Sequence, residues 1–274
     1  MNADRMRRLG RQEETPLREE VAKANVARTE PLVSIVVPSF NQGRFLDDAL
    51  ASIFQQEIEV EVFVLDGGSS DNSLDVISKW QHRLAGWRSQ ADDGQAAAIN
   101  EGIALGRAPY VCWLNSDDWF LPGGLAKLVS EMETHIEVPA VYGRSWNVVE
   151  KSGRRYPVWV EPFNERRLAL RCIISQPATL IRRSVWEAVG GVDAKLHMAM
   201  DYDLWWRLFT AAGPLHFFND FVAVNRVHEA TKTKTQRRLH YQEAMMVVRK
   251  YHGRVPLKWW LAQPYAVWFK SRVG

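Results

Sequence analysis

Acidic and amide side chains follow three apolar segments of the chain that have the composition of buried strands. These polar groups lie at 38–41, 66–71 and 115–118. In an open α/β sheet the carboxyl ends of the strands meet in one crevice, where ligands bind. Carboxylates in that position suit Mg²⁺ or Mn²⁺, ions that bridge to substrate phosphates. The pattern therefore predicts one site for a phosphate-containing ligand and a divalent metal.

Asp117 and Asp118 are the carboxylates that we expect to hold this metal. They lie in the run Cys-Trp-Leu-Asn-Ser-Asp-Asp-Trp-Phe, and acids that serve only solubility rarely have such apolar neighbours. The dinucleotide fingerprint G-x-G-x-x-G and the phosphate-binding loop G-x-x-x-x-G-K-S/T are absent. Dehydrogenases and P-loop nucleotide hydrolases are therefore disfavoured.

A second acidic cluster occurs in Met-Asp-Tyr-Asp-Leu-Trp-Trp-Arg, residues 200–207. Asp201 precedes an amphipathic segment and could be the N-cap of a helix there. Asp203 would then lie in the first turn, where the helix dipole favours an anion. Stabilising the start of this helix requires only one of the two carboxylates, so the other could serve as a general base. We expect Arg207 to pair with an acid.

These groups are positioned by segments whose patterns alternate between strand and helix as far as about residue 135. Continuous apolar runs predict buried strands at 33–37, 60–65 and 110–114, and helical spacing occurs around 45–54, 74–80, 95–105 and 125–129. The alternation predicts parallel βαβ units in an open sheet covered on both faces. Beyond it we expect a hairpin over 141–160, helices at 163–171, 183–189 and 201–211, and one or two short strands over 215–224.

The composition is that of a globular protein, with 46% hydrophobic and 24% charged residues in 274. The two cysteines, Cys112 and Cys172, are too few for a disulfide framework, and we expect buried, reduced thiols. The first 30 residues are polar and carry no secretory signal, and no apolar run reaches about 18 residues. These features predict a cytoplasmic protein.

Positive charge is concentrated near the end of the chain. The net charge is +3, but eleven Lys or Arg against two acids occur from Arg226 onward, among several Trp and Tyr. Two interpretations stay open: peripheral contact of this tail with an anionic membrane, or a helical tail whose aromatic side chains pack on the domain. Nucleic-acid binding is disfavoured because the remainder of the chain is acidic and contains no known reader motif.

Seven segments, taken in order, resemble glycosyltransferase family 2 of the bacterial cell-surface polysaccharide type, which has the GT-A fold. They are Val-Ser-Ile-Val-Val-Pro-Ser-Phe-Asn (33–41), Val-Leu-Asp-Gly-Gly-Ser-Ser-Asp (64–71), Asp-Asp-Gly-Gln-Ala-Ala-Ala-Ile-Asn-Glu-Gly (92–102), Trp-Leu-Asn-Ser-Asp-Asp (113–118), Gln-Pro-Ala-Thr (176–179), Ala-Met-Asp-Tyr-Asp-Leu-Trp-Trp-Arg (199–207) and Arg-Val-His (226–228). The resemblance implies a Rossmann-like, mostly parallel sheet with helices on both faces, followed by the helical basic tail.

The resemblance also implies roles for individual residues. Asp201 corresponds to the catalytic base, Asp118 to the metal ligand and Asp117 to its neighbour at the ribose or metal, while His228 corresponds to a position near the metal or diphosphate. The remaining positions correspond to the nucleotide-sugar pocket: Pro38, Phe40, Asn41, Asp66, Asp92, Gly94, Gln95, Asn100 and Asn115. Asn115 replaces the usual first acid of the metal motif, which puts the strength of metal binding in doubt, and Phe40 lacks a hydroxyl that is common there.

The implied reaction is an inverting transfer from a nucleotide-diphosphate sugar, with UDP-sugars favoured over GDP- and dTDP-sugars, to a glycan or lipid-linked acceptor. The metal would be Mg²⁺ or Mn²⁺. We expect a polar extension over 1–30, a GT-A domain over 31–236 and the tail over 237–274. Within that domain the donor half would end near 135, and the acceptor half would present Trp146, Trp159, Trp205 and Trp206 either to sugars or to the core. The alternative is a non-catalytic nucleotide-sugar or carbohydrate-binding module of the same fold.

Overall fold

The computed structural model describes residues 30–269, so the predicted polar extension lies almost entirely outside the described residues. Strand β1 (Val33–Ser39) is buried along its whole length, as its apolar composition predicts. It pairs in parallel with β2 (Val60–Asp66) on one side and β4 (Tyr110–Trp113) on the other, and β3 (Gly86–Ser89) extends the sheet beyond β2. The parallel βαβ half of the prediction is therefore confirmed.

The second half of the chain adds strands of both directions. Strand β8 (Thr179–Arg182), which the sequence pattern did not predict, lies antiparallel between β4 and β6 (Ala140–Val149). Strand β7 (Arg155–Pro157) completes the expected hairpin with β6. A single strand, β9 (His216–Val227), replaces the expected short strands, runs parallel to β6, and pairs with β5 (Trp119–Phe120) at the edge. Within the described residues the sheet order is β3-β2-β1-β4-β8-β6-β9-β5.

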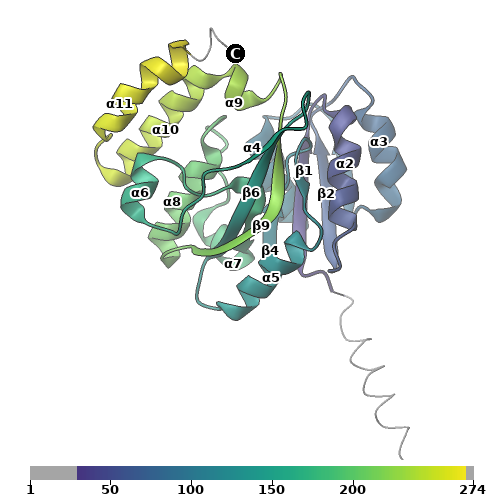
Figure 1. The fold of residues 1–274 in the computed structure, drawn as a ribbon. Helices are drawn as coiled ribbons and strands as arrows, with labels where there is room; N and C mark the ends of the chain where they lie inside the picture. Colours follow the sequence, from purple (N-terminus) through teal and green to yellow (C-terminus); the bar gives the residue numbers. More distant parts are fainter. Residues whose placement is uncertain (1–29, 270–274) are drawn as a thin grey trace, which may run out of the picture.

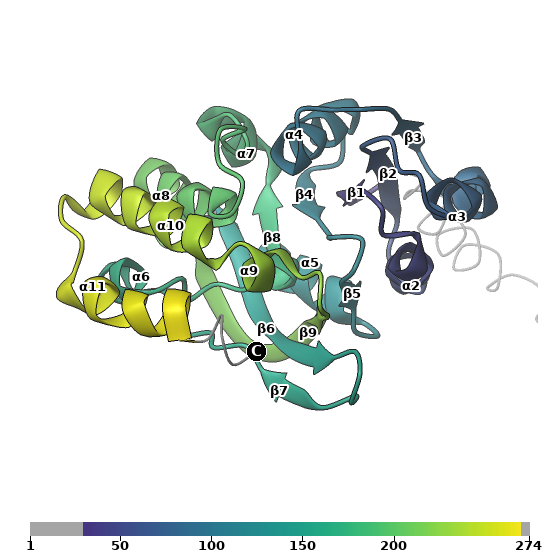
Figure 2. The same ribbon diagram turned by 90° about the horizontal axis from the view of Figure 1, so that it is seen from above.

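Helices cover both faces of the sheet (Figure 2). Helices α2 (Gly43–Phe54), α3 (Ser73–Trp80) and α5 (Gly124–Thr134) share one core with Val33, Ile35 and Val37 of β1. Helices α4 (Gln95–Leu105), α7 (Arg183–Val189) and α8 (Met200–Ala212) share the other core with Val36. This alternation along β1 confirms the expected two-sided sheet, because successive side chains of a strand point to opposite faces.

The tail forms helices that lie against the domain beside α6 (Glu165–Leu170) and α8 (Figure 1). These helices are α10 (Arg237–His252) and α11 (Leu257–Gln263), followed by a π-helical turn over Pro264–Phe269. The short helix α9 (Lys232–Thr235) comes just before the tail. The Tyr251 ring stacks on Trp206, and the Trp259 indole N–H donates to the carbonyl oxygen of Ala169. Of the two open interpretations, packing therefore holds for these aromatic side chains. Among the described helices none is long and apolar enough to span a membrane.

Candidate functional site

Three loops converge at the upper end of the sheet in Figure 1, where β1, β2 and β4 finish. Beside them, Phe40 after β1, Gly67 after β2 and Asp92 after β3 lie close together. A Cβ atom added to Gly67 would lie 3.3 Å from the Phe40 ring and 3.5 Å from a carboxylate oxygen of Asp92. The Phe40 ring is 61% exposed, so its face is open to a ligand. An exposed ring beside a small residue is a suitable surface for stacking a planar base.

Asn41 connects the first two of these loops. It adopts φ 53°, the left-handed conformation that asparagine tolerates better than other residues with a Cβ. Its backbone N–H donates to the Ser69 hydroxyl over 2.7 Å, and its side-chain oxygen accepts from the Ser70 N–H over 2.9 Å. Pro38 is the second-last residue of β1. It is buried and lies opposite Leu65 of β2 in the parallel pairing. Both residues therefore shape the loop backbone.

Asp66 is fully buried at the end of β2. Its carboxylate accepts hydrogen bonds from the backbone N–H groups of Gly68 and Ser69 and from the hydroxyls of Ser69 and Ser89. All four partners belong to the protein, so in this conformation Asp66 organises the loop. Its predicted contact with a nucleotide base would require the loop to rearrange, and that role stays a prediction.

The start of α4 brings further predicted residues to the same end of the sheet. Asp92 accepts from the backbone N–H of Gly94, whose φ of 99° and open surroundings suit glycine at the helix start. The Gln95 side chain donates to Asn115 over 2.7 Å. Asn100 instead bonds both backbone groups of Val192, which gives it a structural task between α4 and the segment before α8.

Asp118 lies at the centre of the motif after β4, and only 4% of the residue is exposed. Its carboxylate accepts from the Arg226 backbone N–H and from the Asn115 side chain, each over 3.0 Å. Burial, and secondly the neighbouring Asp117 carboxylate, raise the pKa of Asp118 well above its usual range. A bound cation would favour the ionised carboxylate.

Asp117 faces a different partner from Asp118. One of its oxygens lies 2.9 Å from Nε2 of His228, whose Nδ1 lies 3.5 Å from the Arg44 guanidinium. Among the described residues, Asp117, Asp118 and His228 do not bring three ligand atoms within 4.8 Å of one another. Both nitrogens of His228 are engaged, so here it positions Asp117, and its approach to a metal stays a prediction.

The carboxylates at this site nevertheless suit the expected metal ion as ligands. Mg²⁺ and Mn²⁺ prefer oxygen ligands, and Mg²⁺ keeps several waters and needs only one or two carboxylates beside substrate phosphates. Asp118, with its raised pKa, and Asp117 provide two such carboxylates on adjacent residues. Asn115 donates to Asp118 through its amide nitrogen and therefore orients this carboxylate without adding charge.

Two cationic residues belong to the site, although the motif search did not select them as site residues. Arg226 donates its backbone N–H to Asp118, and its guanidinium donates to the Asp117 carbonyl oxygen. The ammonium group of Lys232 in α9 donates a hydrogen bond to the side-chain oxygen of Gln95 over 2.6 Å. Desolvation lowers the pKa of Lys232, while the charge of Asp117 opposes this shift. The only feature of the sequence that indicated these two residues was the concentration of Lys and Arg that begins at Arg226.

Asp201 lies in the first turn of α8 and is half-buried. The helix begins at Met200 after an Ala199 N-cap with no side-chain cap, so the N-cap prediction for Asp201 was wrong. Within residues 30–269, its carboxylate accepts hydrogen bonds only from backbone N–H groups, that of Tyr202 and its own. Burial raises the pKa of Asp201 to about 6, a value that suits a base near neutral pH.

Asp203 differs from Asp201 in its burial, in its hydrogen-bond partners and in the direction of its pKa shift. It is buried, and its carboxylate accepts from Arg207 over 2.7 Å, Tyr251 over 2.9 Å and Lys250 over 3.1 Å. Burial alone would raise the pKa of Asp203, but the hydrogen bonds and charge of these partners lower it below its usual value. The expected pairing of Arg207 with an acid is confirmed, and Asp203 is the acid with the structural task.

Topology brings Asp201 to the same end of the sheet as the three loops. His216, the first residue of β9, pairs with Val141 near the start of β6, which marks the lower end of the sheet. Helix α8 ends at Ala212, only a short connection before β9. Since the helix must finish near that lower end, its first turn lies towards the upper end.

Most of the predicted sugar-stacking residues belong to the protein interior. Trp205 and Trp206 are buried in the core. Trp146 stacks on Phe221 with ring centroids 4.0 Å apart. Trp159 is exposed, with the Arg171 guanidinium 4.7 Å from its ring centroid, and is the one of the four whose surface suits a sugar. Both cysteines are free, and burial raises the thiol pKa of each, the opposite of the shift that activates a cysteine nucleophile.

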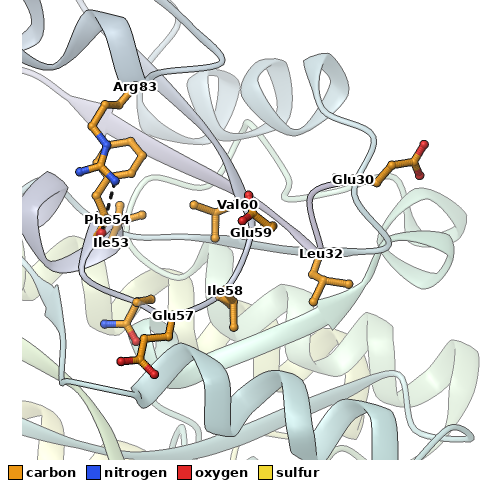
Figure 3. A pocket seen from close by; sticks show the side chains of 10 residues that line it. Glu30, Leu32, Ile53, Phe54, Glu57, Ile58, Glu59, Val60 and Arg83 are labelled. Atoms are coloured by element: carbon orange, nitrogen blue, oxygen red, sulfur yellow. Dashed lines mark hydrogen bonds between the residues drawn. The ribbon is translucent and has the colours of Figure 1, made fainter. Parts of the chain in front are cut away.

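A separate hollow of about 530 Å³ lies at the lower end of the sheet (Figure 3). Its lining includes Leu32 and Val60, where β1 and β2 begin, together with Glu30, Glu57 and Glu59. It is therefore far along the strands from the convergent loops and is no part of the candidate site.

Comparison with known proteins gives a consistent result. The family model "Glycosyl transferase family 2" matches residues 34–190. Chondroitin synthase of Escherichia coli is 25% identical over 223 residues, which cover 80% of this chain and 32% of that protein. Hyaluronan synthase of Pasteurella multocida is 25% identical over 210 residues, which cover 76% of this chain and 21% of that protein. The chain thus spans a third or less of the length of these relatives.

Solved structures identify the fold. TarS (1–349) of S. aureus in complex with UDP-GlcNAc has a TM-score of 0.63 at 17% identity, with 80% of this chain and 66% of that chain covered. The mannosyltransferase PcManGT from Pyrobaculum calidifontis in complex with GDP-Man and Mn²⁺ has a TM-score of 0.65 at 18% identity, with 94% and 80% covered. These similarities confirm the expected GT-A fold.

Proposed function

The chain belongs to glycosyltransferase family 2, and we propose that it transfers a sugar from a nucleotide-diphosphate sugar to an acceptor hydroxyl with inversion at the anomeric carbon. The observation that carries this proposal is the contrast between Asp201 and Asp203. Asp203 is saturated by three cationic or hydroxyl donors, whereas in the described part of the chain Asp201 accepts only from local backbone N–H groups and has a pKa raised to about 6. Asp201 is therefore the carboxylate with a free proton-accepting oxygen.

The donor site is proposed at the convergent loops. The exposed Phe40 ring would stack on the base, with Pro38, Asn41, Asp66, Asp92 and Gly94 shaping its pocket. Gln95 and Asn115 would face the sugar and diphosphate, while Asn100 holds α4 in place. The buried Ser39 hydroxyl at the end of β1 has no hydrogen-bond partner among the described residues, which leaves it available to a ligand. We favour a UDP-sugar as donor.

The metal is proposed at Asp118, with Asp117 as the second carboxylate and His228 behind it. Mg²⁺ or Mn²⁺ there would offset the charge that develops on the departing diphosphate. Lys232 and Arg226 supply fixed positive charge at the same end of the sheet. Together these residues would compensate for the absence of a glycine-rich phosphate loop.

The chemical step uses the chain's own carboxylate on the opposite face of the sugar. Asp201 accepts the proton of the acceptor hydroxyl, whose oxygen attacks the anomeric carbon as the bond to the diphosphate oxygen breaks. A single in-line displacement inverts the configuration, so no covalent glycosyl-enzyme and no second nucleophile are needed. Inverting glycoside hydrolases use a carboxylate base with the same geometric logic.

The acceptor is proposed to be a glycan or a lipid-linked glycan of the cell surface, with Trp159 as a stacking surface. Contact of α11 with the inner face of the cytoplasmic membrane would bring the enzyme to such an acceptor. Leu257, Trp260 and Leu261 share one face of α11 and are each more than half exposed, with Lys258 beside them. Apolar and basic side chains together suit an anionic lipid surface.

The proposed reaction is tested by release of nucleoside diphosphate from a panel of UDP-, GDP- and dTDP-sugars, with and without added oligosaccharide and Mn²⁺. We expect one donor to raise the unfolding temperature in a metal-dependent way and to be turned over faster when acceptor is present. Binding without turnover for every donor and acceptor would favour the non-catalytic module instead.

A further inference from the structure

A second cluster of metal-binding side chains lies away from the donor site, at the lower end of the sheet. Glu131 lies in the last turn of α5, and His135, four residues later, is the C-cap of that helix, so the two side chains lie on the same side of the helix end. His216 is the first residue of β9, the strand against which α5 packs. Figure 1 shows α5 at the end opposite to the convergent loops.

The spacing of the three side chains matches a small coordination sphere. Nε2 of His216 lies 3.2 Å from a carboxylate oxygen of Glu131, and Nδ1 of His135 lies 3.6 Å from the same oxygen. One ligand atom from each residue lies within 4.8 Å of the other two. Tetrahedral Zn²⁺ with bonds of about 2.1 Å has ligand atoms about 3.4 Å apart, so only small side-chain movements would complete the site.

The exposure of the cluster also suits a metal. The rings of His135 and His216 stack with centroids 3.7 Å apart. Nδ1 of His135 also lies 3.0 Å from the backbone carbonyl oxygen of Glu131, and an ion bound at this nitrogen would replace that contact. The three side chains are 27–32% exposed, which leaves an entry path and space for a water ligand.

The backbone that carries His135 is fixed before any ion binds. The Arg182 guanidinium donates to the carbonyl oxygens of Met132 and His135 over 2.9 Å each and to that of Val138 over 2.8 Å. These bonds hold the end of α5 and the segment after it against Arg182, the last residue of β8. A preorganised set of ligands loses less conformational freedom on binding an ion.

We propose that Glu131, His135 and His216 bind a divalent transition-metal ion of the Zn²⁺ type, with water in the fourth position. Two imidazoles favour Zn²⁺, Ni²⁺ or Co²⁺ over Mg²⁺, so this ion differs in kind from the one proposed at Asp118. The metal joins α5 to β9 and stabilises the lower end of the sheet. It takes no part in the transfer reaction, which lies at the other end.

The proposal is tested on the full chain after removal of metal with a chelator. Zn²⁺ is titrated by calorimetry with Mg²⁺ in excess to occupy the oxygen site, and Co²⁺ is titrated by absorption spectroscopy. We expect His216→Gln and Glu131→Gln to weaken Zn²⁺ binding at least ~10-fold and to abolish the increase in unfolding temperature that Zn²⁺ gives the wild type.

Two control variants separate the sites. His82→Gln, an exposed histidine outside the cluster, and Asp118→Asn should both retain wild-type Zn²⁺ affinity. Metal-free His216→Gln should unfold at the same temperature as the metal-free wild type, because the ligands are partly exposed. Equal Zn²⁺ affinity in the wild type and His216→Gln, or loss of Zn²⁺ binding in Asp118→Asn, would overturn the proposal.

Discussion

The carboxylate of Glu243 in α10 accepts a hydrogen bond from the backbone N–H of Ala199, 2.9 Å away, two residues before Asp201. The same carboxylate accepts from Met198 over 2.7 Å and from His197 over 3.1 Å. A buried side chain of the tail therefore fixes the segment that carries the proposed base. Through this contact the tail supports the structure of the domain, in addition to carrying positive charge.

Replacement of Glu243 by alanine should lower both stability and turnover. Three backbone donors would lose a charged acceptor, and loss at a buried donor such as that of Ala199 typically costs about 1–3 kcal/mol, so we expect a marked fall in the free energy of unfolding. The turnover number of the folded fraction should fall while donor affinity persists, because the donor residues belong to other loops. Denaturant unfolding and donor calorimetry measure the two effects. Glu243→Gln retains an acceptor oxygen and should be intermediate, and equal damage in both variants would argue against this role.

Replacement of Asp118 by asparagine should remove the response to Mg²⁺ or Mn²⁺. We expect transfer to fall at least ~100-fold, since the charge on the departing diphosphate would be poorly compensated, and a chelator to inactivate the wild type reversibly. Asp220→Asn, at an exposed ion pair with Lys127, is the matched control and should retain activity. Full activity of Asp118→Asn in chelator would contradict the metal assignment.

Lys232→Gln should weaken donor binding, because it removes the positive charge that α9 places beside Gln95, at the proposed diphosphate site. We expect the donor KM to rise about 10-fold, which is about 1.4 kcal/mol, with a smaller change in turnover number. Lys234→Gln removes a neighbouring charge of the same helix and should leave the donor KM unchanged. A similar KM increase in both variants would indicate a general charge effect instead of a local contact.

Binding to lipid vesicles tests the proposed membrane contact of α11. We expect the chain to float with anionic vesicles at low salt, to release as salt rises, and to bind neutral vesicles weakly. Trp260→Ser should reduce flotation, whereas Ile136→Ser, an exposed apolar residue of the connection after α5, should leave it unchanged. Equal binding to neutral and anionic vesicles, or binding to neither, would contradict an electrostatic contact.

Local sequence patterns predicted the features that depend on neighbouring residues. The strands ending at Ser39, Asp66 and Trp113 and helix α4 follow from continuous apolar runs and helical spacing. The three polar clusters after these strands meet at one end of the sheet as expected.

Features that depend on contacts between distant segments were not predictable in the same way. Glu243 binds the segment before Asp201 from more than forty residues away, so no local pattern could identify it. The N-cap prediction for Asp201 failed because helix α8 begins at Met200, two residues before the start that an N-cap at Asp201 implies. Strand β8 has only four residues, and its position between β4 and β6 depends on long-range pairing.

The raised pKa of Asp201 gives a prediction about pH for both rate and stability. A base with a pKa of about 6 must be ionised to accept a proton, so turnover should fall tenfold for each pH unit below about 6 and level off above it. Stability should change in the opposite direction, because the folded state favours the protonated acid and is penalised as pH rises from about 4 to about 6. Asp201→Asn should therefore unfold at or above the wild-type temperature at neutral pH.

The turnover number of Asp201→Asn at neutral pH, with saturating donor and acceptor, tests the account most directly. The amide preserves the size of the side chain but cannot accept the proton, so we predict a loss of about 10²–10⁴-fold with donor affinity unchanged. Asp203→Asn, in which a buried carboxylate loses its ion pairs with Arg207 and Lys250, should be less stable but should retain the turnover number in its folded fraction. Near-normal turnover by Asp201→Asn would contradict the assignment of the general base, and loss in Asp203→Asn alone would transfer that role to Asp203.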